Sequence, residues 1–338
     1  MAATLEPRRA RLELIYRGVD IAEHCESAEY VDFAEGQVDE LRCTLEDREL
    51  RWQGPWFPGK GEEVRAYIRC FDWDGPGDAP RLDCGLMEIG EVTLSGPPDM
   101  VEITAASARV KSTARVQKKT KAWEDKALSH IAAHVAEKCG LGLHWEGLDH
   151  HFERVDQREE SDLGFLTRLA REHGNSVKTA HEKLIVYAGH KYDQRGPHAT
   201  LTRGHSDIIG YRFATTSHDL YKGAVVSYWR PELKEHIVGE FWPDPAPASQ
   251  DVLRVNQPVK DAAEAAKLAQ TSLRRKNKVE VTAEITLKGA PFRRATEVVR
   301  MSGFGRFDGR YFVAEARHGL SGGGVYQTTL SLRQVIAY

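Results

Sequence analysis

Apolar and polar side chains alternate with a period of two at the start of the chain. Leu12, Leu14 and Tyr16 share one face of a first predicted strand, and the stretches DELRCTLED, EEVRAYIRCF and MVEITAASARV repeat the pattern up to residue 110. Segments rich in Gly, Pro and Asp separate these stretches and predict turns. Short strands at this spacing are typical of an antiparallel barrel or sandwich.

The last third of the chain shows the same alternation. It occurs in VEVTAEITLKG, YFVAEARHGL and VYQTTLSLRQVIAY, and SGGG at 321–324 predicts a hairpin connection between the last two. DLYKGAVVSYWR at 219–230 predicts another strand, and FWPDPAPASQ after it predicts a loop. The sequence therefore predicts strands at both ends of the chain.

From about residue 111 the period becomes helical. In KAWEDKALSHIAAHVAEKCGL, the stripe formed by Leu128, Ile131, Val135 and Cys139 predicts a helix that ends at Gly140. Another helix is predicted in PVKDAAEAAKLAQTSLRRKN, where Pro258 lies near the first turn. The apolar side of that helix is predicted to comprise Ala262, Ala266, Ala269 and Leu273.

The stretch DQREESDLGFLTRLAREHG at 156–174 predicts a capped helix. Ser161 or Asp162 is the candidate N-cap, and Gly174 ends the helix. Its acidic start is interpreted as a helix entrance at the positive end of the dipole, formed by Asp156, Glu159, Glu160 and Asp162. Its apolar face, which we expect to anchor the middle of the chain between the strand-rich ends, comprises Leu163, Phe165, Leu166, Leu169 and Ala170. NSVKTAHEKLIVYAG then predicts two strands around a turn.

Composition limits the classes of function. The 338 residues suit two or three domains, and 47 Lys and Arg against 50 Asp and Glu leave a net charge of -3, which favours neither nucleic acid nor anionic membrane as a partner. No apolar stretch approaches the ~20 residues that cross a bilayer, so we expect synthesis in the cytosol. The five cysteines form no CxxC pair, and Cys43 and Cys70 are expected in the core.

Histidines supply the candidate chemistry. His130 and His134 have the spacing of a helical zinc site, but Ile131 replaces the glutamate of HExxH, so a solvated helix face is the preferred interpretation. A second cluster could hold a divalent ion and would support the alternative of a metal-dependent hydrolase; it comprises His144, Glu146, Asp149, His150 and His151. No nucleophile or phosphate-binding motif accompanies it, so we predict no catalytic residue, no cofactor and no metal ligand.

Three segments resemble the phage late-control D family, the tail baseplate hub proteins of contractile phages and related contractile injection systems. Residues 155–189 resemble its central signature through Gln157, Glu160, Ser161, Asp162, Phe165, Leu166, Arg168, Leu169, Ala170 and Gly174. The preceding helix resembles the family through Trp123, Leu128, Gly140 and Leu141. The closing strands resemble it through Gly309, Tyr311, Val313, His318, Tyr326 and Thr328. We expect these positions to serve structure.

The resemblance implies an α+β, β-rich fold with two tail-tube-like antiparallel β-barrels joined by a mixed α/β middle domain. The implied division is 1–110 for the first barrel, 111–211 for the middle and 212–338 for the second barrel, with a helical insertion at about 236–278 that packs beside the middle domain. Three such chains would form a pseudo-six-fold ring that adapts the hexameric tail tube to the trimeric spike. The implied role is structural, without enzyme activity.

The resemblance also implies partners. They are two further copies in a homotrimer, a spike protein that is a separate polypeptide, a tail tube or tube-initiator protein and baseplate wedge proteins, with neither a membrane nor a sequence-specific nucleic acid. The chain would be made in the bacterial host cytoplasm and assembled in the baseplate of a virion tail or tail-like particle. The kind of particle stays open. Loop aromatics are either partner contacts or local cores; they are Trp52, Trp56, Phe57 and Trp73.

Overall fold

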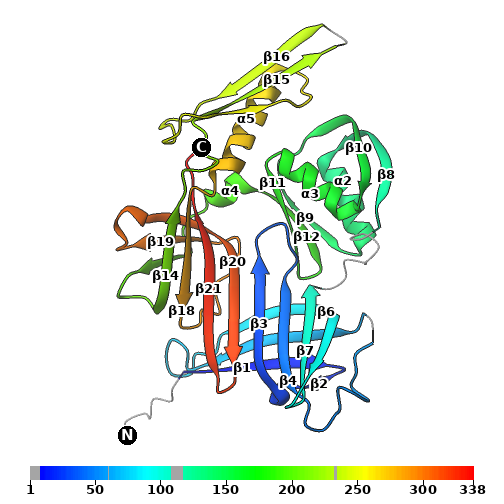
Figure 1. Ribbon diagram of the computed structural model, residues 1–338, viewed down its shortest axis with the longest axis vertical. Helices are drawn as coiled ribbons and strands as arrows, with labels where there is room; N and C mark the ends of the chain where they lie inside the picture. The colour runs from blue at the N-terminus through cyan, green and yellow to red at the C-terminus, as the bar shows by residue number, and fades with distance from the viewer. Residues whose placement is uncertain (1–7, 60, 108–116, 232–233) are drawn as a thin grey trace.

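Strands from both ends of the chain form one large sheet. The computed structural model describes residues 8–59, 61–107, 117–231 and 234–338 (Figure 1). The sheet has 13 strands, in the order β14-β18-β21-β20-β3-β4-β7-β6-β5-β1-β2, and β19 joins it beside β20 and carries β13. The fold is β-rich and largely antiparallel, which confirms the predicted class. The expected boundary at residues 110 and 111 lies outside the described residues.

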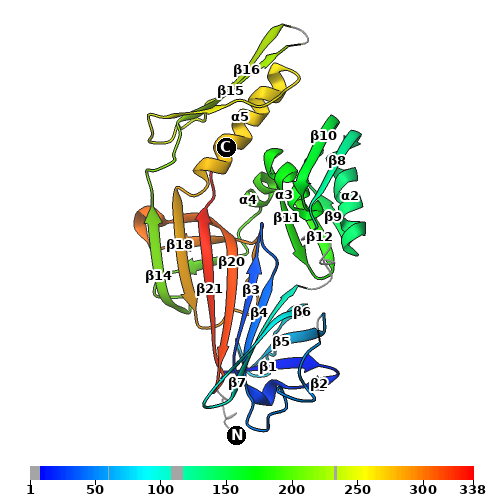
Figure 2. The same cartoon turned by 45° about the vertical axis from the view of Figure 1, so that its right-hand side comes forward.

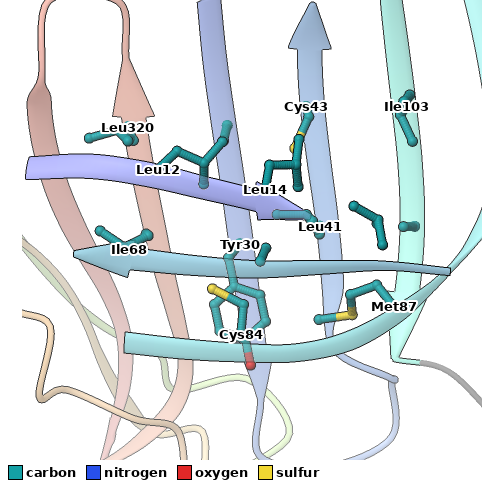
Figure 3. Close-up of a cluster of buried hydrophobic side chains, with 14 of the residues drawn as sticks. Leu12, Leu14, Tyr30, Leu41, Cys43, Ile68, Cys84, Met87, Ile103 and Leu320 are labelled. Atoms are coloured by element: carbon teal, nitrogen blue, oxygen red, sulfur yellow. The ribbon is translucent and has the colours of Figure 1, made fainter. Parts of the chain in front are cut away.

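The N-terminal strands confirm the period-two pattern. Their bounds are β1 (Arg9–Tyr16), β2 (Val19–Asp20), β3 (Cys25–Phe33), β4 (Glu40–Glu46), β5 (Glu63–Phe71), β6 (Arg81–Ser95) and β7 (Met100–Ser107). The long strand β6 pairs with β5 through its first part and with β7 through its second, so the sheet folds over itself. Figure 3 shows Leu12, Leu14 and Ile68 on strands that run across β3, which carries Tyr30, and β4, which carries Leu41 and Cys43.

Two of the loop tryptophans belong to this core. Trp52 and Trp73 are buried and pack with the strands, whereas Phe57 is 59% exposed. Cys43 and Cys70 are buried in the same core, as predicted. The loops of this end of the chain are therefore held by their own aromatics, and Phe57 is the one of the four that stays available to a partner.

The C-terminal strands complete the sheet. Their bounds are β13 (Ala199–Thr202), β14 (Ile208–Thr215), β18 (Val281–Leu287), β19 (Val298–Ser302), β20 (Gly309–Ser321) and β21 (Val325–Gln334). The predicted hairpin connection at 321–324 joins β20 and β21. The last part of β20 pairs with β3, from Glu315 opposite Phe33 to Ser321 opposite Ser27. An alternating pattern predicts a strand but not the strand with which it pairs. The pairing of N-terminal with C-terminal strands in one sheet therefore cannot be predicted from the pattern.

The middle of the chain forms an α/β unit with its own core. Its elements are β8 (Lys119–Ala127), α2 (Leu128–Cys139), β9 (Gly142–Glu146), β10 (His151–Glu160), α3 (Asp162–Glu172), β11 (Asn175–Ala180), β12 (Lys183–Ala188) and α4 (Gly189–Asp193). β8 pairs with β10, and β11, β12 and β9 form a separate sheet. The predicted strand pair at 175–189 is confirmed, and so is the left-handed cap at Gly140.

Two predictions for this unit are wrong. Residues 121–127 are strand rather than helix, because they pair with β10, which places Trp123 opposite Val155. Asp156, Glu159 and Glu160 lie on β10, so the helix entrance is limited to Ser161 and Asp162. In both places a ladder with a segment remote in sequence overrides local helix propensity.

The apolar face of α3 is buried within this unit. Phe165, Leu166 and Leu169 pack with Trp123 and with α2, and the rings of Trp123 and Phe165 stack with centroids 6.1 Å apart. The amphipathic pattern predicted the buried face correctly. The expectation that it lies against the strand-rich ends is wrong, because α2 and the two small sheets of the unit cover it.

The segment between β14 and β18 holds α5 (Ala262–Asn277) and three strands, β15 (Gly223–Arg230), β16 (Glu235–Phe241) and β17 (Val252–Val255). The helix begins after its N-cap Asp261 rather than near Pro258, and it buries Ala265 in place of the predicted Ala262. It packs closely on β16, since a Cβ at Gly239 would meet the Ala266 nitrogen at 2.3 Å. Figures 1 and 2 show this unit at the end of the molecule opposite the N-terminus. Among the described residues, no helix combines the length and apolar character that a membrane span needs.

Candidate functional site: the junction of the sheets

The signature motif lies where β8, β10 and α3 meet. Gln157 is fully buried, and its Nε2 donates to the Glu160 carbonyl at 2.9 Å and to Asp162 Oδ1 at 3.1 Å. Lys119 donates to the same Asp162 carboxylate. Burial raises the pKa of Asp162, but the bonds from Lys119 and Gln157 outweigh it and hold the pKa below its ordinary value. Ser161 Oγ accepts from Gly164 N at 3.1 Å and caps α3.

The remaining motif residues also hold local structure. Glu160 pairs with Arg168 at 3.0 Å, and Gly174 has φ of 75°, which ends the α3 segment. Leu128 is buried at the start of α2. At the other end of the chain, Gly309 begins β20, and the buried Tyr311 donates its hydroxyl to the Phe307 carbonyl at 2.9 Å. The structure brings the motif residues of segment 123–174 together around α3. It keeps the motif residues of the closing strands, at 309–328, apart from them.

His318 is the most enclosed of the motif residues. Its Nε2 lies 3.1 Å from the Arg293 carbonyl and its Nδ1 lies 2.7 Å from the Tyr326 hydroxyl and 3.2 Å from Thr328 Oγ1. A carbonyl can only accept, so Nε2 carries the proton and Nδ1 accepts from Tyr326. Burial lowers the pKa of His318 to about 4. The ring is therefore a neutral hydrogen-bonding group of the core.

This geometry predicts a pH dependence for His318→Gln. Unfolding takes up a proton between the ordinary pKa of 6.5 and the folded pKa of about 4, so the wild type loses stability as the pH falls through that window. Between pH 6.5 and 5 the loss attributable to this group is roughly 2 kcal/mol. Urea titrations at several pH values should show a shallower decrease in the variant than in the wild type. Equal slopes would contradict the assignment of a buried neutral ring.

The histidine cluster at 144–151 does not converge. His144 lies 3.0 Å from Glu146, His151 lies 3.2 Å from Asp125, and His150 stacks on His173 with ring centroids 4.0 Å apart. In the described ranges, no three His, Cys, Asp or Glu side chains are grouped as metal ligands would be. The hydrolase alternative receives no support from this arrangement. The predicted solvated face is confirmed for His130, which is exposed, and is wrong for His134, which is half-buried and packs edge-on against Trp123.

A buried charge network that the motifs did not indicate joins all three parts of the chain. Lys178 on β11 donates to Asp32 on β3, to the Phe33 carbonyl at 2.6 Å and to Asp39 at 3.4 Å. Asp32 also accepts from Ala295 N at 2.9 Å, in the loop between the C-terminal strands β18 and β19. Burial raises the pKa of Asp39 to about 6, against the opposing effect of Lys178. The Lys178 ammonium therefore ties the middle unit to the N-terminal strands, and the Asp32 carboxylate extends the link to the C-terminal part of the chain.

A second network lies at Asp193, at the end of α4. Its carboxylate is buried and accepts from Arg333 on β21 at 2.8 Å and from Arg274 on α5. Its backbone carbonyl accepts from Arg310 at 2.5 Å. Nearby, Glu35 binds Lys278 and Ser176, and Tyr187 donates to the Ala34 carbonyl at 2.9 Å. The only sequence signal for these residues is charge within apolar runs, as in YVDFA at 30–34.

These contacts make the junction a rigid structural site. The buried carboxylates of Asp32 and Asp193 are paired with cations, and the contacts come from β3, β11, α4, α5 and β21. Two buried atoms of the junction, Thr179 Oγ1 and Arg310 Nε, have no hydrogen-bond partner in the described residues. Separating the parts of the chain would leave buried charges without their partners, which costs free energy. The network therefore fixes how the parts are arranged. The arrangement orients the sheets, and its described residues place no general base beside a nucleophile.

Comparison with known proteins supports the motif resemblance. No protein-family model matches the chain. The chain is 27% identical over 232 residues to the probable baseplate hub protein of Escherichia phage 186, covering 66% of this chain and 53% of that protein. It is 30% identical over 202 residues to the probable baseplate hub protein of Escherichia phage P2, covering 57% of this chain and 48% of that protein. The chain thus spans about half the length of the curated relatives it matches.

Solved structures share the fold. A tail protein from Neisseria meningitidis MC58 matches with a TM-score of 0.72 at 15% identity, over 96% of this chain and 97% of that one. The E. coli c3393 protein, a component of the type VI secretion system, matches with a TM-score of 0.59 at 12% identity, over 96% of this chain and 77% of that one. These structures show a shared fold, and the two curated relatives confirm the resemblance to phage baseplate hub proteins.

Proposed function

We propose that this chain is a structural hub at the base of a phage-type contractile tail. In this role three copies form a pseudo-six-fold ring that adapts a hexameric tail tube to a trimeric spike, and the chain performs no catalysis. The curated relatives named as probable baseplate hub proteins support the role. Tube, spike and wedge proteins are the proposed partners, and assembly in a virion tail or tail-like particle is the proposed location.

The observation that carries this proposal is the pairing of β3 with β20. It sets the N-terminal and C-terminal strands side by side in one sheet, much as strands of two neighbouring subunits would meet in a ring. Each chain contributes two strand-rich units, so a ring of three chains contains six such units. We propose the division 1–110, 111–211 and 212–338 on this basis, with the signature residues from Trp123 to His318 serving this framework.

The outer edge of the sheet is the expected contact between copies. β14 ends the sheet, and its exposed side chains include Ile209 and Tyr211, which are 46% and 48% exposed. Open sheet edges are normally paired or covered, and a closed ring covers them with the next copy. The sheet has two edges, one at β14 and one at β1 and β2. We propose that the backbone amide and carbonyl groups along these edges pair with neighbouring chains.

Light scattering on the purified chain tests this contact. The wild type is expected at three times the 37.9 kDa of one chain, and Ile209→Glu is expected to shift the mass to that of one chain, because a carboxylate would be desolvated in the interface. Leu94→Glu is the control, since Leu94 is 50% exposed on β6, away from that edge. A wild type that stays monomeric at high concentration would contradict the ring.

A further inference from the structure

A cavity of about 340 Å³ lies beside the junction, between α5, α3, α4 and β21. This volume is within the ~300–1,000 Å³ of typical ligand sites. Two carboxylates, Glu35 and Asp193, reach its lining. The cationic side chains that line it outnumber them; they are Arg171, Lys267, Arg274, Arg275, Lys278 and Arg333. The cavity therefore has a surplus of positive charge.

The cations fall into two groups. Arg274 and Arg333 bind Asp193, and Lys278 binds Glu35, so these three serve the junction. Within the described part of the chain, Arg171, Lys267 and Arg275 make no ion pair and are at least partly exposed. Removing them leaves the fold's own charge networks intact. Burial lowers the pKa of His190, which lines the same cavity, and the nearby cations Arg274, Lys191 and Lys267 lower it further.

We propose that this cavity binds an acidic peptide segment of a partner protein. The cavity already holds two carboxylates of its own chain. Arg274 and Arg333 bind Asp193, and Lys278 binds Glu35. The lining is therefore suited to binding carboxylate groups. Lys267, Arg274 and Arg275 extend over about two turns of α5, or ~12 Å, and Arg171 at the end of α3 faces the same space. That length suits side chains spaced along an extended segment better than one compact anion.

The lining is unsuited to nucleic acid. Single-stranded binding needs aromatic faces on which bases can stack. Tyr187 is buried, packs against Tyr192 and donates to the Ala34 carbonyl, and the Arg333 guanidinium covers the ring of Phe312 at 4.2 Å. The half-buried Tyr338 packs against Phe241 with ring centroids 5.9 Å apart, and its hydroxyl accepts from Asn277 Nδ2 at 2.7 Å. The aromatic rings are thus occupied by the fold, while the cations remain accessible. The proposal goes beyond the hub role, since it concerns a separate surface and does not need the ring.

Fluorescence polarisation with labelled hexaglutamate on the full chain tests the proposal. The wild type is expected to bind at low ionic strength, and added salt should weaken binding. The triple variant Arg171→Gln, Lys267→Gln, Arg275→Gln is expected to bind about tenfold more weakly, as the loss of three partly exposed charges implies. The matched control replaces three exposed cations outside the cavity by Gln, namely Lys138, Lys183 and Arg306. It changes the net charge by the same amount and should bind hexaglutamate as the wild type does.

Three results would overturn the proposal. They are no binding of hexaglutamate by the wild type, equal weakening in the cavity variant and the control, and binding of an oligothymidylate in place of hexaglutamate with the same dependence on the cavity residues. The last would identify the site as one for nucleic acid. Thermal unfolding of both variants checks that the substitutions leave the fold intact, since the three cavity cations have no ion pairs to lose in the described residues. Light scattering of the cavity variant separates this test from that of the ring.

Discussion

Substitution of Leu166 by Asp is expected to abolish the folded middle unit. Leu166 is 0% exposed in the core between α3, α2 and the small sheets. Losing a buried leucine costs about 2–5 kcal/mol. Burying an unpaired carboxylate adds several kcal/mol more. The sum approaches the ~5–15 kcal/mol by which a whole domain is stable, so circular dichroism should show no cooperative unfolding of this unit.

Leu163→Asp on the same helix is the matched control. Leu163 is half-buried at the margin of the same core, in the first turn of α3, where a carboxylate can keep part of its hydration and lies at the positive end of the dipole. That variant should therefore unfold cooperatively with only modestly reduced stability. Leu169→Asp, at 1% exposure, should behave as Leu166→Asp does. If the Leu166 variant melts at the wild-type temperature, the assignment of this face to the core is wrong.

Substitution of Asp193 by Asn should loosen the junction. The Asp193 side chain is 2% exposed, and its partners Arg274 and Arg333 are 17% and 11% exposed, so removing the carboxylate leaves two enclosed guanidinium groups without their counter-charge. Breaking a buried pair in this way typically costs about 3–5 kcal/mol. The loss should appear in urea titrations and as faster proteolysis near α4 and α5, because those elements depend on the contact.

Asp219→Asn provides the comparison for that experiment. Asp219 pairs with Lys276 at 3.1 Å, but both side chains are well exposed, so the pair is screened and its loss should change stability little. A double replacement of Asp193 and Arg333 by Asn and Met should recover part of the loss, since it removes one of the unpaired charges. Equal stability of the Asp193 and Asp219 variants would contradict the structural role of the junction.

The sequence predicts local features well. The α3 helix is specified by neighbouring residues, through the Ser161 cap, the apolar face and the terminating Gly174, and all three are found in the structure. The alternating strands at both ends are specified in the same way. Each of these signals acts within a few residues, so no knowledge of the rest of the fold is needed.

Features that depend on remote partners could not be predicted. Residues 121–127 have helix-forming composition, and only pairing with β10 makes them a strand. The β3–β20 contact joins segments almost 300 residues apart, and no pattern within either strand encodes it. The charge networks at Lys178 and Asp193 are likewise visible only when β3, β21 and α5 are brought together. The separation of the histidines at 144–151 also depends on remote residues, because His150 stacks on His173 and His151 pairs with Asp125.

Electron microscopy of the assembly formed by the purified chain tests the central proposal most directly. Class averages of the purified chain, viewed along the axis, should show a closed ring of three copies with six similar lobes around a central channel, two from each chain. The β3–β20 junction should lie within each chain between its two lobes. A monomer, an open filament or a ring without pseudo-six-fold symmetry would contradict the hub.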